Sequence, residues 1–142
     1  MLGRKPNAAL YFHGYGGTVE STASPLKNPI KVSQIEPDHP IALLTRKSVL
    51  GDRMLVAFVH LTKGCNVERH RHESEQIAII RSGSVRWTIG EEDSDEYQVF
   101  MARAGDVVVL RSNVIHGVDA EEDTEIIDVL TPIGPMGVDA HR

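Results

Sequence analysis

The segment "HRHESEQ", from His70 to Gln76, concentrates histidines, carboxylates and an amide between two apolar runs of the chain. His70 and His72 are two residues apart, so on a β-strand both side chains point to the same face, about 6.5–7 Å apart. Two such imidazoles can converge on one ion, because each nitrogen binds a metal such as zinc at about 2.0–2.1 Å. The bare spacing is equally compatible with a solvated turn that contains histidine.

Two further residues are candidates for proton transfer. Asp128 lies in the apolar run "EIIDVLTP", and a buried carboxylate needs a partner and often carries function. A hydrogen bond from Asp128 to a turn is the structural alternative. His60 shares one face of its predicted strand with Val56 and Phe58, where it either lines a pocket as an acid or base or lies in water. We expect Trp87 to pack in the core, with stacking on a ligand as the alternative.

The elements that must position these residues are short β-strands. From Ile41 onwards the chain consists of short β-branched runs separated by glycine-rich and acidic turn signals, which is typical of a sandwich or barrel. The run "IRSGSVRW" predicts a hairpin with Gly83 at its tip. The acidic segment from Gly90 to Glu96 predicts a solvated hairpin loop, with a cation-binding loop as the minor alternative.

The first 40 residues have a different character. They are rich in glycine, serine, threonine and proline, which argues against a helix. The aromatic segment "YFHGY", from Tyr11 to Tyr15, favours an arm that is partly ordered at an interface. We therefore expect an N-terminal arm over residues 1–40, a barrel over residues 41–134 and a C-terminal tail over residues 135–142.

Composition restricts the class of protein. A chain of 142 residues suits one domain, and its net charge of -5 offers no basic surface for nucleic acid. No apolar run approaches the ~18 residues of a membrane span, and the N-terminus lacks the apolar core of a secretory signal. The single cysteine, Cys65, permits no internal disulfide. We expect a cytoplasmic protein with neither a membrane nor a nucleic-acid partner.

Two segments, "GCNVERHRHESEQIAIIRSG" and "GDVVVLRSNVIH", resemble the paired motifs of the cupin superfamily in their order and spacing. The first has Gln76 where the family has glutamate, and the second has Arg111 where the family has proline. The resemblance extends roughly from Arg53 to Pro132. It implies an all-β fold, the double-stranded β-helix or jelly-roll barrel. It also implies one divalent metal ion held by four side chains: His70, His72, Gln76 and His116.

The fourth ligand has an alternative in the neighbouring Glu75. Glu75 is the harder anion, but Gln76 keeps the spacing of the family motif. Three neutral imidazoles and a neutral amide leave a divalent ion with its full charge, which favours anionic substrate groups and Lewis-acid chemistry over iron–oxygen chemistry. The donor set is compatible with Zn, Ni, Fe or Mn, and the metal's identity stays open.

Within the superfamily, the chain is similar to small single-domain cupins (cupin 2 type) related to pectin-degradation proteins, which help open unsaturated uronate rings into linear keto sugars. Asp128, Thr131 and Pro132 match the end of a strand in those proteins. Leu130 replaces their phenylalanine, and Gly134 falls where an arginine is expected, so a carboxylate clamp is missing at that position.

Several functions remain open. The first is a metal-dependent enzyme on a small anionic or oxygenated molecule, in which Asp128 or His60 moves a proton. A dioxygenase of a small diketone-like substrate is an oxygen-using variant. The alternative class is a non-catalytic small-molecule-binding cupin, with or without its metal. Members of the family that this chain resembles commonly form dimers. This resemblance and the aromatic segment of the arm lead us to expect a homodimer.

Overall fold

The strands arise from a simple alternation of burial along the chain. A computed structural model describes residues 27–139 of the protein. Strands β1 (Leu44–Leu50) and β2 (Leu55–Leu61) each alternate buried and half-buried side chains along their whole length. Successive residues of a strand point to opposite faces, so one set of side chains enters the core and the other lies on the surface.

Nine strands and two short 3-10 helices make up the described chain. The helices are η1 (Val32–Gln34) and η2 (Gly137–Asp139). The other strands are β3 (Asn66–His70), β4 (Glu75–Ser82), β5 (Ser84–Ile89), β6 (Gln98–Arg103), β7 (Val107–Leu110), β8 (His116–Ala120) and β9 (Thr124–Thr131).

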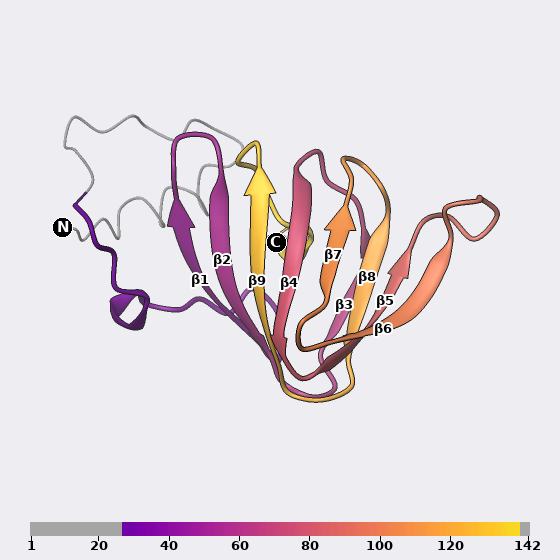
Figure 1. Cartoon of the computed structure of the whole chain (residues 1–142), viewed down its shortest axis with the longest axis horizontal. Coiled ribbons are helices and arrows are strands. Elements are labelled where there is room, and N and C mark those ends of the chain that lie inside the picture. Colours follow the sequence, from indigo (N-terminus) through magenta and orange to yellow (C-terminus); the bar gives the residue numbers. More distant parts are fainter. Residues whose placement is uncertain (1–26, 140–142) are drawn as a thin grey trace.

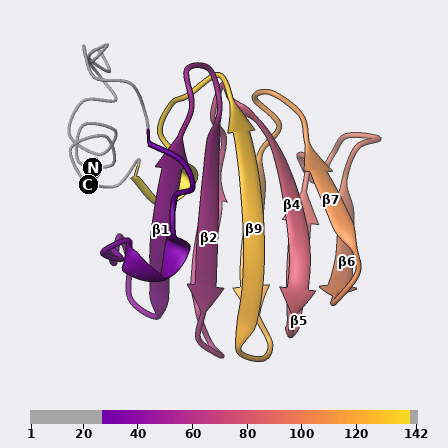
Figure 2. The same ribbon diagram turned by 60° about the vertical axis from the view of Figure 1, so that its left-hand side comes forward.

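The strands form two antiparallel sheets that face each other across one core (Figure 1). The five-stranded sheet has the order β1-β2-β9-β4-β7 and is seen face-on in Figure 2. The four-stranded sheet has the order β3-β8-β5-β6. Side chains of both sheets fill the space between them, including the buried indole of Trp87. The predicted all-β jelly-roll architecture is confirmed.

The turn at Gly83 differs from the expected hairpin. β4 pairs with β7 and β9, whereas β5 pairs with β6 and β8, so Gly83 connects two sheets instead of two neighbouring strands. Its φ of +90° lies in the left-handed region, and a Cβ there would overlap the chain at Asp123 and Thr124. Only glycine meets both conditions without strain. The corner between the sheets therefore depends on this residue.

The acidic segment forms a loop of the expected kind. β5 and β6 pair in an antiparallel register from Ser84 opposite Arg103 to Ile89 opposite Gln98. The connecting residues 91–97 are exposed. Glu91 forms a surface ion pair with Arg71 at 2.6 Å. The prediction of a solvated hairpin loop is confirmed.

Part of the N-terminal region is described. Asp38 forms an isolated backbone bridge with Arg46 on β1, after the short turn of η1. Residues 1–26, and with them the segment Tyr11–Tyr15, lie outside the described residues. The division into arm, barrel and tail stays a prediction. Within residues 27–139, no helix is long and apolar enough to cross a membrane.

Candidate metal centre

Two histidines face each other across a pair of neighbouring strands. β3 ends at His70 and β8 begins at His116, and the register pairs these two residues directly. Opposed side chains on one face of an antiparallel pair lie close together. We expected His70 and His72 to share a strand, but β3 ends at His70 and His72 lies beyond it. His116 is the first residue of β8.

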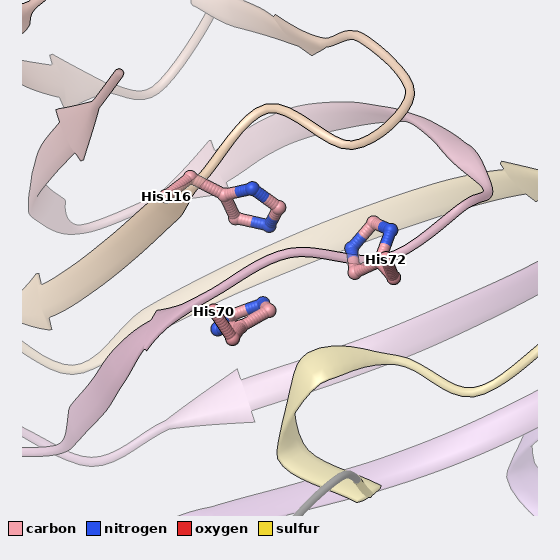
Figure 3. Close-up of side chains that lie close together, drawn as sticks. All are labelled: His70, His72 and His116. Atoms are coloured by element: carbon pink, nitrogen blue, oxygen red, sulfur yellow. The ribbon is translucent and has the colours of Figure 1, made fainter. Parts of the chain in front are cut away.

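The three imidazoles nevertheless converge (Figure 3). One nitrogen of each ring lies within 4.8 Å of the corresponding atoms of the other two, close enough to hold a metal ion. The ring centroids of His70 and His116 are 4.3 Å apart, and those of His72 and His116 are 4.9 Å apart. His70 is half-buried, while His72 and His116 are buried. The cluster therefore lies at the inner edge of the barrel.

Backbone carbonyl groups define the tautomer of all three rings. A carbonyl oxygen only accepts, so a neutral imidazole bonded to it through Nδ1 carries its proton there and has a lone pair on Nε2. Such second partners commonly orient metal-binding histidines. The three contacts are His70 Nδ1 to Glu68 O at 2.6 Å, His72 Nδ1 to Ser74 O at 2.9 Å and His116 Nδ1 to Val114 O at 2.8 Å.

The surroundings of the Nε2 atoms of His72 and His116 suit a bound cation. The buried Nε2 of His116 has no hydrogen-bond partner within the described part of the chain. The Nε2 of His72 lies 3.1 Å from Oε1 of Gln76, and two lone pairs facing each other at this distance are unfavourable. A metal ion held by His72, Gln76 and His116 would satisfy these buried acceptor atoms. The donor set present therefore fits the expected metal.

Burial favours the neutral form of His72 and His116. Loss of water lowers the pKa of His72, against the opposing effect of its hydrogen bond to Ser74. Burial also lowers the pKa of His116 to about 3, and the nearby His70 acts in the same direction. The neutral imidazole is the form that binds a metal. At pH 7 the two buried rings are thus ready to act as ligands.

The alternation of β4 separates the two candidates for the fourth ligand. Gln76 points inward with 6% of its surface exposed, whereas Glu75 points outward and is exposed. The Gln76 side chain donates from Nε2 to Oδ1 of Asp128 at 2.9 Å. This bond directs Oε1 toward His72. The structure thus brings Gln76 to the histidines and leaves Glu75 on the surface.

Asp128 lies beside this amide, on the inner face of β9. It is 5% exposed and its partner is the Gln76 side chain instead of a turn. Burial raises the pKa of Asp128 to about 7, although the hydrogen bond from Gln76 and the charge of Arg46 act in the opposite direction. A carboxyl group with a pKa near 7 can both donate and accept a proton at neutral pH.

His60 lies on the other side of the sheet. In β2 the residues Ala57 and Val59 point inward, so His60 points outward, where it contacts Glu125 of β9. Its side chain is 36% exposed. A proton-transfer role inside the barrel does not agree with this placement, because a strand of period two cannot present His60 and Val59 to the same face.

A cavity of about 50 Å³ adjoins the histidines. His70, His116, Gln76 and Asp128 line it together with Arg46 and apolar residues that include Trp87. Sequence reasoning missed Arg46. The available signal was its position in β1, at the inward spacing of Leu44, where a charged residue requires buried partners.

Comparison with known families agrees with this geometry. The family profile described as the cupin domain matches residues 57–130, just over half of the chain. No curated protein matches the sequence significantly.

Several solved structures share the fold. A RmlC-like cupin from Shewanella frigidimarina has 18% identity and a TM-score of 0.67, over 75% of this chain and 91% of that one. KdgF from Halomonas sp. has 22% identity and a TM-score of 0.60, over 70% of this chain and 90% of that one. Oxalate decarboxylase from Bacillus subtilis has 21% identity and a TM-score of 0.66, over 80% of this chain. This chain covers only 31% of that enzyme.

Proposed function

We propose that this chain, which belongs to the cupin family, binds one divalent metal ion through four side chains: His70, His72, Gln76 and His116. The proposal is supported by the converging histidines and by the two buried acceptors, on His72 and Gln76, that face each other at 3.1 Å. All four donors are neutral, so the ion keeps its full charge. The preferred candidates are Zn, Ni, Fe and Mn.

The proposed activity is Lewis-acid chemistry on a small anionic or oxygenated metabolite, of the kind that opens or isomerises a sugar acid. A bound divalent ion supplies polarisation of a carbonyl or hydroxyl oxygen. Asp128 moves the proton at its Oδ2 atom, since Oδ1 accepts the hydrogen bond from Gln76. The observation that carries this proposal is a titratable carboxylate in the cavity that the histidines line.

Known structures of the same fold are compatible with this proposal. KdgF from Halomonas sp. and oxalate decarboxylase from Bacillus subtilis share this fold, and the latter is described with Mn(II) centres. The name of oxalate decarboxylase points to a small organic acid as the substrate of that enzyme. At about 20% identity the likeness is one of fold, so the substrate class proposed for this chain depends on its own cavity.

A non-catalytic binding role is the second candidate. The observation in its favour is the size of the cavity, about 50 Å³, because ligand pockets for small organic molecules usually measure about 300–1,000 Å³. A cavity of this size holds a few water molecules. Under this alternative the metal is structural, and Asp128 serves to orient Gln76.

A homodimer is the proposed assembly, through the outer face of the five-stranded sheet (Figure 2). Two rows of cross-strand neighbours run across all five strands, and their side chains are half-buried or exposed. One row is entirely apolar, and the other has a single charged member. The rows are Val49, Val56, Val129, Ile77 and Val109, and Lys47, Phe58, Ile127, Ile79 and Val107.

The size and borders of this apolar face suit a second copy of the chain. Five strands of up to eight residues, spaced by about 4.8 Å, cover roughly 500 Å² in projection. Because the side chains project from the sheet, the accessible area of this face is larger and approaches the ~800 Å² that each partner buries in a standard dimer. Polar residues border the rows at both strand ends, including His60 and Glu125 at one end and Glu75 at the other. An apolar centre with a polar rim is the usual anatomy of an interface.

The remaining expectations concern location and other partners. We propose a cytoplasmic protein on the basis of its single cysteine. The net charge of -5 makes nucleic acid an unsuitable partner.

The test of the proposed activity is turnover of unsaturated uronates by protein loaded with each candidate metal in turn. We expect ring opening without oxygen consumption, and its loss in Asp128→Asn while the metal stays bound. Oxygen consumption with a small diketone would instead identify a dioxygenase. Binding of uronates without turnover under any metal would favour the binding role.

A further inference from the structure

The C-terminal segment Met136–Asp139, here called the strap, covers the cavity beside the histidines. Met136 and Val138 are buried and line the cavity, and Gly137 lies against the ring of His70. A Cβ at Gly137 would overlap that imidazole. Figure 3 shows the yellow ribbon of this segment beside the three histidines. The strap thus forms one wall of the cavity that His70 and His116 line.

A bidentate salt bridge between Asp139 and Arg46 holds the strap in place. The guanidinium donates from Nη1 to Oδ2 of Asp139 at 3.0 Å and from Nη2 to Oδ1 at 2.8 Å. Its other edge donates to Asp38, from Nε at 3.1 Å and from Nη2 at 2.9 Å. The Arg46 side chain is fully buried, and Asp139 is 1% exposed. Arg46 also lines the cavity.

We propose that Arg46 is the binding group for the carboxylate of the substrate, and that Asp139 occupies its place until the substrate arrives. This inference rests on the proposed function, because it names the group that recognises the anionic substrate. The paired contacts of Arg46 with Asp139 have the geometry in which arginine binds any carboxylate. Asp38 retains the second edge of the guanidinium throughout, so Arg46 stays oriented during the exchange.

Charge explains why this exchange selects anions. A buried guanidinium that loses one carboxylate without a replacement is strongly disfavoured. An incoming carboxylate restores the lost contacts, whereas a neutral molecule of similar shape does not. Release of Asp139 into water is favourable for its own charge. Arg46 would therefore exchange one carboxylate for another and reject neutral analogues.

The position of the strap joins this exchange to the metal centre. Asp139 accepts from the backbone N–H of Met136 at 3.1 Å, and its own N–H donates to the Met136 carbonyl at 2.9 Å. The carboxylate therefore also holds the turn together. Its release frees Gly137 from His70 and enlarges a cavity of about 50 Å³. Binding of the substrate carboxylate to Arg46 would thus be coupled to access to the histidines.

The alternative is an ion pair that only fastens the C-terminal segment to the barrel. Hydrogen exchange of the full chain separates the two, with D-galacturonate as the probe and D-galactose as its neutral match. We expect galacturonate, and not galactose, to accelerate exchange of the Met136 and Asp139 amides. Equal effects of both sugars, or no effect of either, would overturn the proposal.

The matched variant is Asp139→Asn, which keeps the size of the side chain and removes its charge. We expect it to bind galacturonate roughly tenfold more tightly in calorimetry, since the internal competitor is weakened. Glu121→Gln, in the exposed pair with Arg86, should leave the affinity unchanged. Unchanged or weaker binding by Asp139→Asn would contradict the inference.

The same titrations on chelator-treated protein distinguish this inference from the proposed function. Arg46 binds the carboxylate through its own charge, so the tenfold difference between the variant and the natural protein should persist without metal. Loss of the difference in both forms, with normal metal content by elemental analysis, would overturn the role of Arg46 alone. Absence of metal in the natural protein would instead overturn the proposed function.

Discussion

The amide of Gln76 is held in one orientation by Asp128. Its Nε2 donates to Oδ1 of Asp128 at 2.9 Å, and its Oε1 consequently lies 3.1 Å from Nε2 of His72. An ionised carboxylate accepts and cannot donate, so while Asp128 is ionised the flipped amide would lose this bond. One hydrogen bond therefore joins the residue with a pKa near 7 to the proposed fourth metal ligand.

Loss of the Gln76 amide should weaken metal binding without abolishing it. We expect Gln76→Ala to lower the affinity for zinc by about 10- to 100-fold, because three imidazoles remain. Competition with a coloured chelator measures this affinity. Glu75→Ala is the matched control on the outer face of β4. A larger loss in Glu75→Ala than in Gln76→Ala would show that the neighbouring carboxylate is the ligand.

Removal of one histidine of the cluster should have a stronger effect than removal of a histidine elsewhere. We expect His70→Ala and His116→Ala to lose most of the bound metal by elemental analysis of protein prepared without chelator. His60→Ala should keep its metal, because this ring lies on the outer face with Glu125. Full metal content in both cluster variants would exclude the site.

Asp128 should make the metal-free protein less stable as the pH rises. Its folded-state pKa of about 7 lies above the ordinary value of 3.8. Between these values the folded state binds more protons than the unfolded state, so the free energy of unfolding falls with increasing pH. Asp128→Asn imitates the protonated side chain. We expect the variant to exceed the natural protein in stability, by a margin that grows from pH 4 to pH 7.

The difference in the free energy of unfolding between the two proteins has an upper limit, and urea denaturation measures it. A shift of about three pKa units corresponds to a total on the order of 4 kcal/mol. Urea denaturation with chelator present, at pH 4.5 and pH 8, gives the difference between the two proteins. A margin that is equal at both values would mean that Asp128 titrates normally in the folded state.

The corner glycine should tolerate a methyl group less well than a glycine in open space. Gly83 and Gly105 have similar φ angles of +90° and +96°, but a Cβ on Gly105 meets no atom within 4 Å. We expect Gly105→Ala to cost about 1 kcal/mol from backbone strain alone. Gly83→Ala should cost at least roughly twice as much, since its methyl group overlaps the chain at Thr124. Thermal unfolding of the two variants compares these costs, and equal losses would contradict the close approach.

A charge on the apolar sheet face should separate the proposed dimer. Val109 is 53% exposed and neighbours Ile77, which is 37% exposed. We expect Val109→Lys to convert a dimer into a monomer by light scattering, because the partner's apolar face would bury the ammonium group. Lys63→Glu, outside the strands, is the control. A monomeric natural protein would contradict the dimer, and a dimer that tolerates Val109→Lys would locate the interface elsewhere.

The local structure of the chain could be predicted from its sequence to a large extent. Alternating β-branched runs indicate strands, and strands such as β2 and β9 follow those runs closely. The histidine spacing, read with the resemblance to cupins, predicts that His70, His72 and His116 belong to one site. Residue type and spacing suffice here because strand periodicity and imidazole chemistry are local properties.

Other features depended on long-range packing. In β2 both alternate sets are apolar apart from His60, so periodicity predicts the alternation but not which set points inward. The outward position of His60 follows only from the sheet. β4 and β5 resemble a hairpin, yet they enter different sheets at Gly83.

The same holds for the contacts that complete the site. His70 meets His116 through the register of β3 with β8, and Arg46 meets Asp139 from far along the chain. The sequence by itself determined the strands and the type of metal donor. The tertiary structure decided which face each strand buries and which charges meet, because these depend on contacts between segments whose separation in sequence carries no local signal.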